Sequence, residues 1–231
     1  MKNYVLVGDI HSQYLQLYNA FKYIQENIQD YHIIFLGDLF DSRTEYSNSL
    51  GVYELTRELQ NQNKCTILQS NHQDKLIRYL KGNQVYLNNG LDITLEDFKN
   101  SNVSNEELLE WLQSFSYGLV FKDKNNLEYR CSHAYFSSKF FVPEEYTDEF
   151  QIHVVSKQTK SKCLYGIIQD HQRVEWWKQD SSHSWIRVAG HYHQVHIDLE
   201  RTKSIVLDGE CGSDNGKLYI YDVNSQQSHF F

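Results

Sequence analysis

Side chains of the types that bind divalent cations follow each strong apolar run of this sequence. The clusters contain aspartate, asparagine or histidine, and none of them contains cysteine. They are Asp9 and His11 after YVLV, Asp38 and Asp41 after HIIFLG, Asn71 and His72 after CTILQS, His133 after LEYRCS, and His191 and His193 after WIRVAG. Where strand ends converge at one edge of a sheet, these side chains would meet and offer a site for metal ions.

Each cluster taken alone has a simpler explanation. An aspartate after a strand is commonly a helix N-cap, which would suit Asp9 or Asp38. Asn71 alone fits a turn, and His133 alone fits a half-buried histidine without a ligand role. All of them at one edge would form a crowd of like charges and unpaired donors, which is costly without a cation. We therefore expect Asp9 and His11 to begin a metal site.

The donor types narrow the kind of metal. Carboxylate, amide and imidazole ligands without thiolate suit borderline-hard ions such as Mn²⁺, Fe or Zn²⁺. The candidates outnumber the ligands of one tetrahedral ion, which favours two ions. Two ions about 3.5–4 Å apart that share a carboxylate form the arrangement used for phosphoester displacement.

The elements that must position these residues alternate between strands and helices over the first 82 residues. Strands are predicted at 4–7, 32–37 and 65–70, and helices at 13–28, 51–61 and 72–80, with Gly82 as the C-cap. This repetition implies right-handed crossovers and a mostly parallel sheet, whose ligands gather at the carboxyl ends of the strands.

The remainder of the chain returns to strands after a helical stretch. Ser104 and Glu107 form a capping box before a helix, and strands are predicted at 117–121, 127–133, 185–190, 204–209 and 217–223. Short turns between the last of these favour antiparallel pairing. We expect one domain over residues 1–231, with a helical insertion around 135–183 that lies over the site.

Composition excludes several classes of protein. The chain has 231 residues, 40% of them hydrophobic, and a formal net charge of -8 without a basic stripe, so stable nucleic-acid binding is not expected. Four cysteines without CxxC spacing favour reduced thiols in a core. No apolar run approaches the roughly 20 residues of a membrane span, and the N-terminus lacks a signal pattern. A cytoplasmic location without membrane contact is therefore expected.

With the clusters assembled, the chain resembles the calcineurin-like metallophosphoesterases. The matching motifs are GDIH (8–11), GDLFD (37–41), SNHQ (70–73), SHA (132–134) and GHYH (190–193), in the family's order. SNHQDKLIRYLKG and GLDITLEDF are similar to the small bacterial and phage protein phosphatases and to the phosphatase module of bacterial polynucleotide kinase–phosphatases. LDGECGSDNGKLYIYDV resembles the closing strands of the same group, which includes diadenosine tetraphosphate hydrolases. The resemblance implies an α/β fold, a mixed β-sandwich flanked by helices in four α/β/β/α layers.

The resemblance also implies a role for each matching residue. Asp9 and His11 would ligate the first metal, and Asp38 would bridge both. Asn71, His133 and His191 would complete the second. His72 would protonate the leaving oxygen while Asp41 holds it, and a metal-activated water would attack phosphorus. His193 is a further candidate ligand, with a surface or supporting role as the alternative.

Three positions depart from the family pattern. Ser42 stands where the family has a phosphate-binding arginine, with Arg43 one place later, and Ser70 replaces a glycine. Gln73 replaces an acidic residue. Arg43 and Arg173 are the candidates for binding the substrate phosphate, and a surface position is the alternative for Arg173.

The leading hypothesis is a dimetal phosphomonoesterase that acts on phosphoserine or phosphothreonine proteins or on small phosphorylated compounds. The metals are expected to be two divalent ions, Mn²⁺ first, with Fe, Zn, Ni and Mg as alternatives. A second reading is a hydrolase of diadenosine tetraphosphate or another nucleotide, in which Trp176 and Trp177 would stack a base, with packing inside the fold as the equal alternative for these two residues. A third is a non-catalytic metal-binding module of the same fold.

Overall fold

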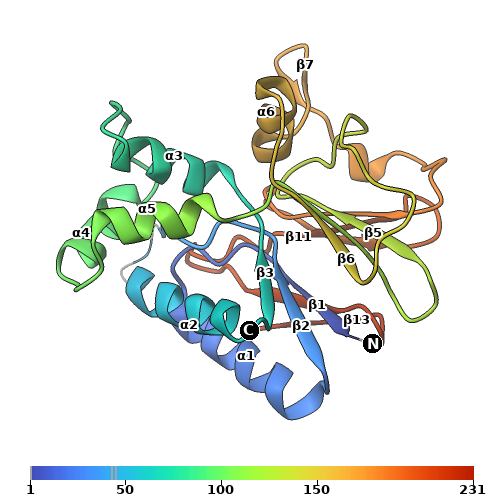
Figure 1. The fold of residues 1–231 in the computed structure, drawn as a ribbon, viewed down its shortest axis with the longest axis horizontal. Coiled ribbons are helices and arrows are strands. Elements are labelled where there is room, and N and C mark those ends of the chain that lie inside the picture. The colour runs from blue at the N-terminus through green and yellow to red at the C-terminus, as the bar shows by residue number, and fades with distance from the viewer. Residues whose placement is uncertain (1, 43, 45) are drawn as a thin grey trace.

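Two packed β-sheets form the centre of the molecule (Figure 1). The computed structural model describes residues 2–42, 44 and 46–231. The first sheet has the strand order β13-β12-β1-β2-β3 and the second has the order β10-β11-β9-β5-β4-β6. The first contains β1 (Asn3–Val7), β2 (Tyr31–Phe35), β3 (Cys65–Ile67), β12 (Tyr219–Asp222) and β13 (Gln227–Phe230). The second contains β4 (Gly118–Lys122), β5 (Glu128–Cys131), β6 (Glu149–Ile152), β9 (Ile186–Ala189), β10 (Val195–Asp198) and β11 (Ser204–Leu207).

Helices cover the first sheet on its outer face. They are α1 (Tyr14–Asn27) and α2 (Ser49–Asn61), with α3 (Asn71–Leu80), α4 (Leu91–Lys99) and α5 (Asn105–Gln113) beside them at the left of Figure 1. The three early strand–helix repeats are confirmed, and β1, β2 and β3 pair in parallel as expected. Ser104 caps α5 by accepting the backbone N–H of Glu107 at 3.1 Å. Gly82 follows α3 with φ +80°, a left-handed conformation that suits glycine.

The outer face of the second sheet carries a thinner layer. The segment 135–183 holds β6, one helix α6 (Lys157–Tyr165), the short hairpin β7 (Ile168–Gln169) and β8 (Gln172–Arg173), and a 3₁₀ turn η1 (Trp176–Lys178). α6 and the hairpin lie at the top of Figure 1. The two-sheet α/β sandwich agrees with the expected fold class, but helix is a minor part of this segment.

The predicted antiparallel pairing of the late strands is wrong in part. β9 and β11 pair in parallel, and the strand β10 between them in sequence pairs with β11 from the other side. β12 leaves this sheet altogether and pairs with β1 in the first sheet. Short connections predicted hairpins here, whereas the chain makes a crossover and then changes sheets.

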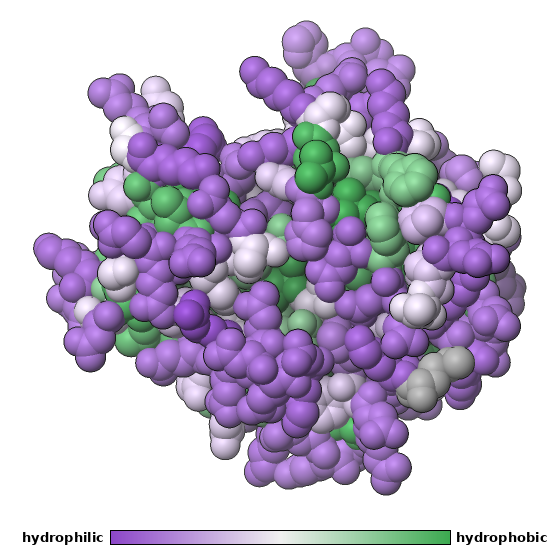
Figure 2. Space-filling model, in the orientation of Figure 1, coloured by the Kyte–Doolittle hydropathy of each residue, from purple (hydrophilic) through white to green (hydrophobic). Residues whose placement is uncertain are grey.

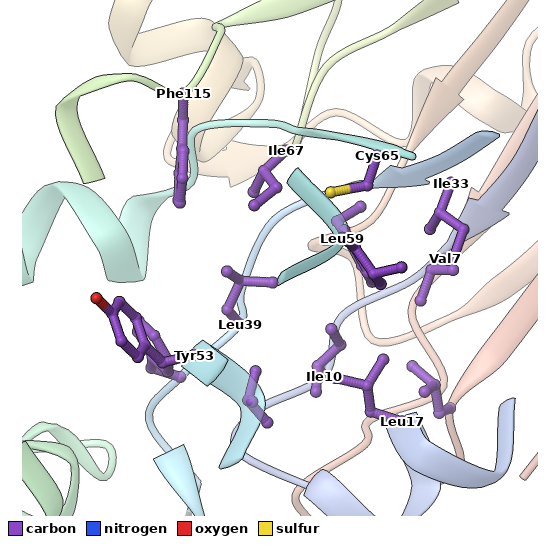
Figure 3. Close-up of a cluster of buried hydrophobic side chains, with 14 of the residues drawn as sticks. Val7, Ile10, Leu17, Ile33, Leu39, Tyr53, Leu59, Cys65, Ile67 and Phe115 are labelled. Atoms are coloured by element: carbon purple, nitrogen blue, oxygen red, sulfur yellow. The ribbon is translucent and has the colours of Figure 1, made fainter. Parts of the chain in front are cut away.

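Apolar side chains fill both sides of the first sheet. Between this sheet and the helices lies the cluster of Figure 3, in which Val7, Ile33 and Ile67 point from the strands toward Leu17 and Leu59 of the helices. Between the two sheets lies a second cluster of fully buried side chains. Alternate residues of β1 serve these two clusters, since successive side chains of a strand point to opposite faces. The site is built on strands that are fixed from both sides.

The face seen in Figure 2 is mainly hydrophilic, with apolar residues in small separate groups. Within the described part of the chain, no helix is both long and apolar enough to cross a bilayer.

Candidate metal and active site

The carboxyl ends of six parallel strands meet at one junction between the sheets. β1, β2 and β3 run in parallel in the first sheet, and β5, β9 and β11 run in parallel in the second. Each strand is followed within a few residues by one donor side chain facing the junction. These are Asp9, Asp38, Asn71, His133, His191 and Asp208. The five predicted strand ends therefore converge, and a sixth joins them.

The backbone is unusual where these strands end. His11, Asp38, Asp41 and His191 have positive φ values of 48°, 40°, 72° and 70°. Residues other than glycine rarely adopt this left-handed backbone conformation, and each such residue costs on the order of 1–3 kcal/mol of folding free energy. Such strain persists only where the surrounding structure holds it, and it gathers at functional sites. Sharp turns of this kind point the side chains toward the junction instead of along the strand.

Asp9 is held by the glycine–histidine turn after β9. Its Oδ2 accepts the backbone N–H of His191 at 2.8 Å. A Cβ at Gly190 would lie 3.0 Å from Asp9 Cγ and closer still to Oδ1, so this position admits no side chain. Gly8 shows the same constraint, because a Cβ there would overlap the carbonyl oxygen of Leu207. The glycines of the GD and GH motifs therefore allow the two sheets to approach.

Two imidazoles are oriented by backbone carbonyls. His133 Nδ1 donates to the Leu36 carbonyl at 2.9 Å, and His11 Nδ1 lies 3.1 Å from the Phe40 carbonyl. A carbonyl only accepts, so Nδ1 carries the proton in each ring and Nε2 keeps its lone pair. These Nε2 atoms lie 3.4 Å and 3.7 Å from Asp38 Oδ2. Both rings are thus prepared to act as ligands next to a shared carboxylate.

The donor set fits two divalent cations that share Asp38. Two groups of side chains could supply ligand atoms: His11, Asp38 and His72, and Asp38, His133 and His191, with all atoms of a group within 4.8 Å of one another. The hydrogen bond of His72 to Asp41 also suits this ring for a role in proton transfer, apart from the ligands. Asn71 Oδ1 lies 2.7 Å from His133 Nε2. Three buried atoms of the junction that could bind a metal lack a hydrogen-bond partner among the described residues. They are Asp9 Oδ1, Asp38 Oδ1 and His191 Nε2.

Burial and neighbouring charge set the protonation of the ligands. Burial lowers the pKa of His133 and takes that of His191 well below its ordinary value, which favours the neutral imidazole that metals require. Burial raises the pKa of Asp38, but the surrounding imidazoles outweigh it and lower the pKa overall. Burial, then Asp208 and Asp38, raise the pKa of Asp9. Crowded carboxylates of this kind would be relieved by a cation.

His72 and Asp41 form a hydrogen-bonded pair beside the junction. His72 Nδ1 lies 2.8 Å from Asp41 Oδ2, which directs His72 Nε2 toward Asp38 Oδ2 at 3.9 Å. Burial lowers the pKa of His72, and the carboxylates of Asp38 and Asp41 outweigh this and raise it. The ring thus has one nitrogen fixed by a carboxylate and the other facing the cavity.

The remaining sequence candidates fall in different places. Arg173 lines the cavity, where its Nη1 donates to the His191 carbonyl at 3.3 Å and its guanidinium stands 5.6 Å from the Tyr192 ring centre. His193 also lines the cavity, but its side chain is 60% exposed and lies near Asp208, outside both ligand groups. Arg43 lies outside the described residues.

The two serines that depart from the family pattern have structural explanations. Ser70 is extended, with φ -130°, and caps α3 by accepting the Gln73 N–H at 3.3 Å. It therefore needs none of the freedom of glycine. Ser42 is fully buried and accepts from Gln13 Nε2 at 2.8 Å, so its side chain points into the fold and does not line the cavity.

The sequence reasoning missed Asp208 and Glu210. Asp208 is 1% exposed and accepts the backbone N–H of His193 at 2.6 Å and that of Glu210 at 3.0 Å. Its signal was present, because SIVL (204–207) is an apolar run that ends in a carboxylate like the others. The strand predicted over 204–209 took in Asp208 as one of its own residues, so this carboxylate was not recognised as a donor at a strand end. Asp208 holds the turn that carries His191 and His193.

Most of the predicted site residues line one cavity of about 230 Å³. Its polar wall includes Asp9, His11, Asp38, Asp41, Asn71, His72, His191, His193 and Asp208, together with Asn89, Arg173, Glu210 and Ser213. Trp176 and Trp177 do not reach it. They are 3% and 2% exposed and pack with Tyr192 behind the site.

Comparison with known proteins agrees with this arrangement. Residues 2–220 match the model of the calcineurin-like phosphoesterase family. The bis(5'-nucleosyl)-tetraphosphatase PrpE (asymmetrical) of Anoxybacillus flavithermus is 32% identical over 104 residues, which are 42% of this chain and 41% of that protein. The protein of the same name from Oceanobacillus iheyensis is 23% identical over 203 residues, covering 80% and 75% of the two chains.

A solved structure shares the fold. The protein serine/threonine phosphatase of Saccharomyces cerevisiae with similarity to human phosphatase PP5 superposes with a TM-score of 0.61 at 12% identity, over 99% of this chain and 79% of that one. The motif order, the convergent strand ends and the match over residues 2–220 lead to one assignment. This chain belongs to the calcineurin-like phosphoesterase family.

Proposed function

We propose that this phosphoesterase is a divalent-metal-dependent phosphomonoesterase that acts on phosphorylated proteins or small phosphorylated compounds. The observation that carries the proposal is the single polar cavity in which the Asp38-centred ligand groups, the His72–Asp41 pair and Arg173 lie together. A phosphate monoester needs charge neutralisation, a proton for its leaving oxygen and a group that fixes its orientation. This cavity offers all three.

The family is dimetal-dependent, and the proposed holders of the ions are Asp9, His11, Asp38, Asn71, His133 and His191. When bound, the ions would supply positive charge toward the phosphate and acidify a water molecule at neutral pH. Mn²⁺ is the proposed metal, since oxygen and imidazole donors without thiolate suit it. Asp208 supports this centre by holding the backbone of His193.

His72 is the proposed general acid. Asp41 Oδ2 accepts a hydrogen bond from the Nδ1–H group of His72. The second N–H group of the imidazolium is therefore at Nε2, which faces the cavity. The carboxylate of Asp41 stabilises the charged ring and fixes its orientation. His72 would hand its Nε2 proton to the leaving oxygen as the ester bond breaks.

Arg173 is the proposed phosphate-binding residue. Its anchorage on the His191 carbonyl and on the face of Tyr192 leaves other guanidinium N–H groups free to meet phosphate oxygens. The residue reaches the cavity from the end of the β7–β8 hairpin. The segment 135–183 would thus contribute to substrate recognition.

The walls of the cavity favour a monoester. Among the described residues that line it, Arg173 is the only lysine or arginine, and Glu210 adds a negative charge. Among these described residues, a tetraphosphate chain would meet one guanidinium, no ammonium group and this carboxylate. The buried Trp176 and Trp177 offer no face on which a base could stack.

Hydrolysis of a dinucleoside tetraphosphate is the second candidate. The names of the two sequence relatives favour it, and the match to one of them extends over 80% of this chain. It would use the same centre and differ in the groups that hold the leaving nucleotide.

A substrate panel separates these readings. The Mn²⁺-loaded protein is assayed with p-nitrophenyl phosphate, phosphoserine and phosphothreonine peptides, and diadenosine tetraphosphate. We expect the highest kcat/KM on a monoester. A higher kcat/KM on diadenosine tetraphosphate would select the second candidate, and metal binding without hydrolysis of any substrate would identify a non-catalytic module.

His72→Asn tests the proposed acid directly. General acid catalysis typically contributes about 10²- to 10⁴-fold, so we expect kcat on a phosphopeptide to fall by that order. His153→Asn is the matched control, because His153 is exposed and does not line the cavity. A loss in the control equal to that of His72→Asn would contradict the assignment.

A further inference from the structure

A buried threonine of α4 contacts the carboxylate that holds His72. We propose that Thr94 is a positioning residue for the reaction, which fixes Asp41 so that His72 presents its proton to the leaving oxygen. This inference rests on the proposed function, and it concerns a residue outside the metal ligands and outside the cavity wall.

Thr94 makes two contacts with the same aspartate. Its Oγ1 donates to Asp41 Oδ1 at 2.8 Å and accepts the backbone N–H of Asp41 at 3.1 Å. The other carboxylate oxygen of Asp41 accepts from His72 at 2.8 Å. Thr94 is fully buried, so water does not substitute for its hydroxyl. One hydroxyl group thus fixes both the side chain and the main chain of Asp41.

The backbone of Asp41 needs this support. Its φ of 72° lies in the left-handed region, where an aspartate is strained. The hydrogen bond from the Asp41 backbone N–H to Thr94 Oγ1 holds the turn. The hydrogen bond from Thr94 to Asp41 Oδ1 fixes the orientation of the carboxylate plane. Without both contacts, Asp41 Oδ1 would lose its hydrogen bond, and the carboxylate could rotate so that Oδ2 turns away from His72 Nδ1.

Two buried serine hydroxyls, from Ser49 and Ser12, continue the hydrogen-bond chain from Thr94 on the side away from Asp41. Ser49 Oγ lies 3.4 Å from Thr94 Oγ1 and 2.9 Å from Ser12 Oγ, and all three residues are buried. The backbone N–H of Ser49 donates to Asp97 Oδ2 at 2.8 Å, which joins α2 to α4. A hydroxyl donates once and accepts twice, so Thr94 has every hydrogen-bonding position filled. Its hydroxyl therefore has one orientation, toward Asp41.

This use of a helical threonine differs from the ordinary one. Thr56, in the middle of α2, is equally buried and donates to the carbonyl of Val52 one turn back, the usual local bond of a helix hydroxyl. The hydroxyl of Thr94 leaves its helix and bonds to a loop 53 residues away in sequence. Thr56 therefore provides a matched control with the same burial and no link to His72.

The test compares substrates that need the proton to different degrees. p-Nitrophenyl phosphate releases an acidic phenol and needs little protonation, whereas a phosphoserine peptide releases an alkoxide and needs it fully. In the Mn²⁺-loaded protein we expect Thr94→Val to lower kcat about 10- to 100-fold on the peptide, part of the usual contribution of general acid catalysis, with a much smaller loss on p-nitrophenyl phosphate. Thr94→Ser keeps the hydroxyl and should keep the wild-type ratio, as should Thr56→Val.

A readout independent of turnover accompanies the assay. In protein loaded with diamagnetic Zn²⁺ in place of Mn²⁺, the proton shared between His72 and Asp41 should give a downfield NMR resonance, assigned by its absence in His72→Asn. Thr94→Val should broaden or shift this resonance while metal content stays at the wild-type level. Thr94→Ala, which removes volume instead of adding an apolar surface, repeats both measurements if the valine variant does not fold.

Several results would overturn the inference. Equal losses on both substrates, an unchanged kcat on the peptide, or a serine variant that behaves like valine would each exclude positioning through the hydroxyl. If the wild-type protein hydrolyses both substrates, any of these results rejects the role of Thr94 alone. If it hydrolyses neither, the proposed function fails and the inference with it.

Discussion

Gly190→Ala should weaken metal binding although it replaces none of the proposed ligands. The new Cβ would lie 3.0 Å from Asp9 Cγ and closer to Oδ1, whereas carbon atoms in contact are typically about 3.5–4.0 Å apart. Asp9 is therefore displaced by about 1 Å, and its bond from the His191 N–H at 2.8 Å is disturbed at the same time. Disturbing the groups that orient a ligand typically costs about 10- to 100-fold in metal affinity. That loss corresponds to about 1.4 to 2.8 kcal/mol.

Isothermal titration of metal-free protein with Mn²⁺ measures this loss. The control is Gly82→Ala, because no atom lies within 4 Å of its added Cβ, and its φ of +80°, unlike the backbone of Gly190, makes the substitution a test of backbone strain alone. The control should lose about 1 kcal/mol of stability through its backbone and keep the wild-type metal affinity. If Gly190→Ala bound Mn²⁺ with wild-type affinity and stoichiometry, Asp9 would not be a ligand, and our reading of the GH turn would be refuted.

Three further predictions concern other parts of the molecule. Arg173→Ala removes charge-assisted hydrogen bonds worth roughly 1.5–3 kcal/mol, so kcat/KM should fall about 10- to 150-fold, with Arg173→Lys intermediate; an unchanged value would place substrate elsewhere. Burial raises the pKa of three of the four buried cysteine thiols to about 12, so dithiobis-nitrobenzoate should label none of the four in the native protein at mildly alkaline pH and all four in guanidinium. Burial lowers the pKa of His32, and this effect outweighs the nearby carboxylate of Glu149, which raises it. The imidazole of His32 therefore binds a proton more readily in the unfolded chain than in the folded protein. The free energy of unfolding should therefore decrease as the pH falls through 6.5, and His32→Gln should flatten that decrease in chemical denaturation; an identical slope would exclude the histidine as its source.

The first half of the fold was accessible from the sequence because its signals are local. Apolar periodicity predicts the strands at 4–7, 32–37 and 65–70 and the helices between them. The first residues of β1, β2 and β3 fall within two residues of the predicted starts. The convergence of donors at strand ends also follows from local order, since parallel strands end at one edge.

The second half depended on contacts between distant residues. Whether β9 joins β11 in parallel or by a hairpin is decided by which apolar faces meet between the sheets, and connection length does not report it. β13 was missed because QSHF is short, mostly exposed and without an apolar pattern, and β10 because VHID alternates apolar and polar residues over only four positions. Thr94 gave no signal at all, since its partner Asp41 is 53 residues away.

The junction of six strand ends has a consequence for how the protein behaves when metal is scarce. Four of the six proposed ligands follow strands of the first sheet and two follow strands of the second, so bound ions would cross-link the sandwich at the edge where carboxylates crowd. Metal ions that bind only the folded protein stabilise it by mass action, by about 2.7 kcal/mol when their free concentration is a hundred times Kd. Depletion of the cation would then reduce the abundance of folded protein together with its catalytic rate, and a screen that scores cellular activity alone would register the two losses as one.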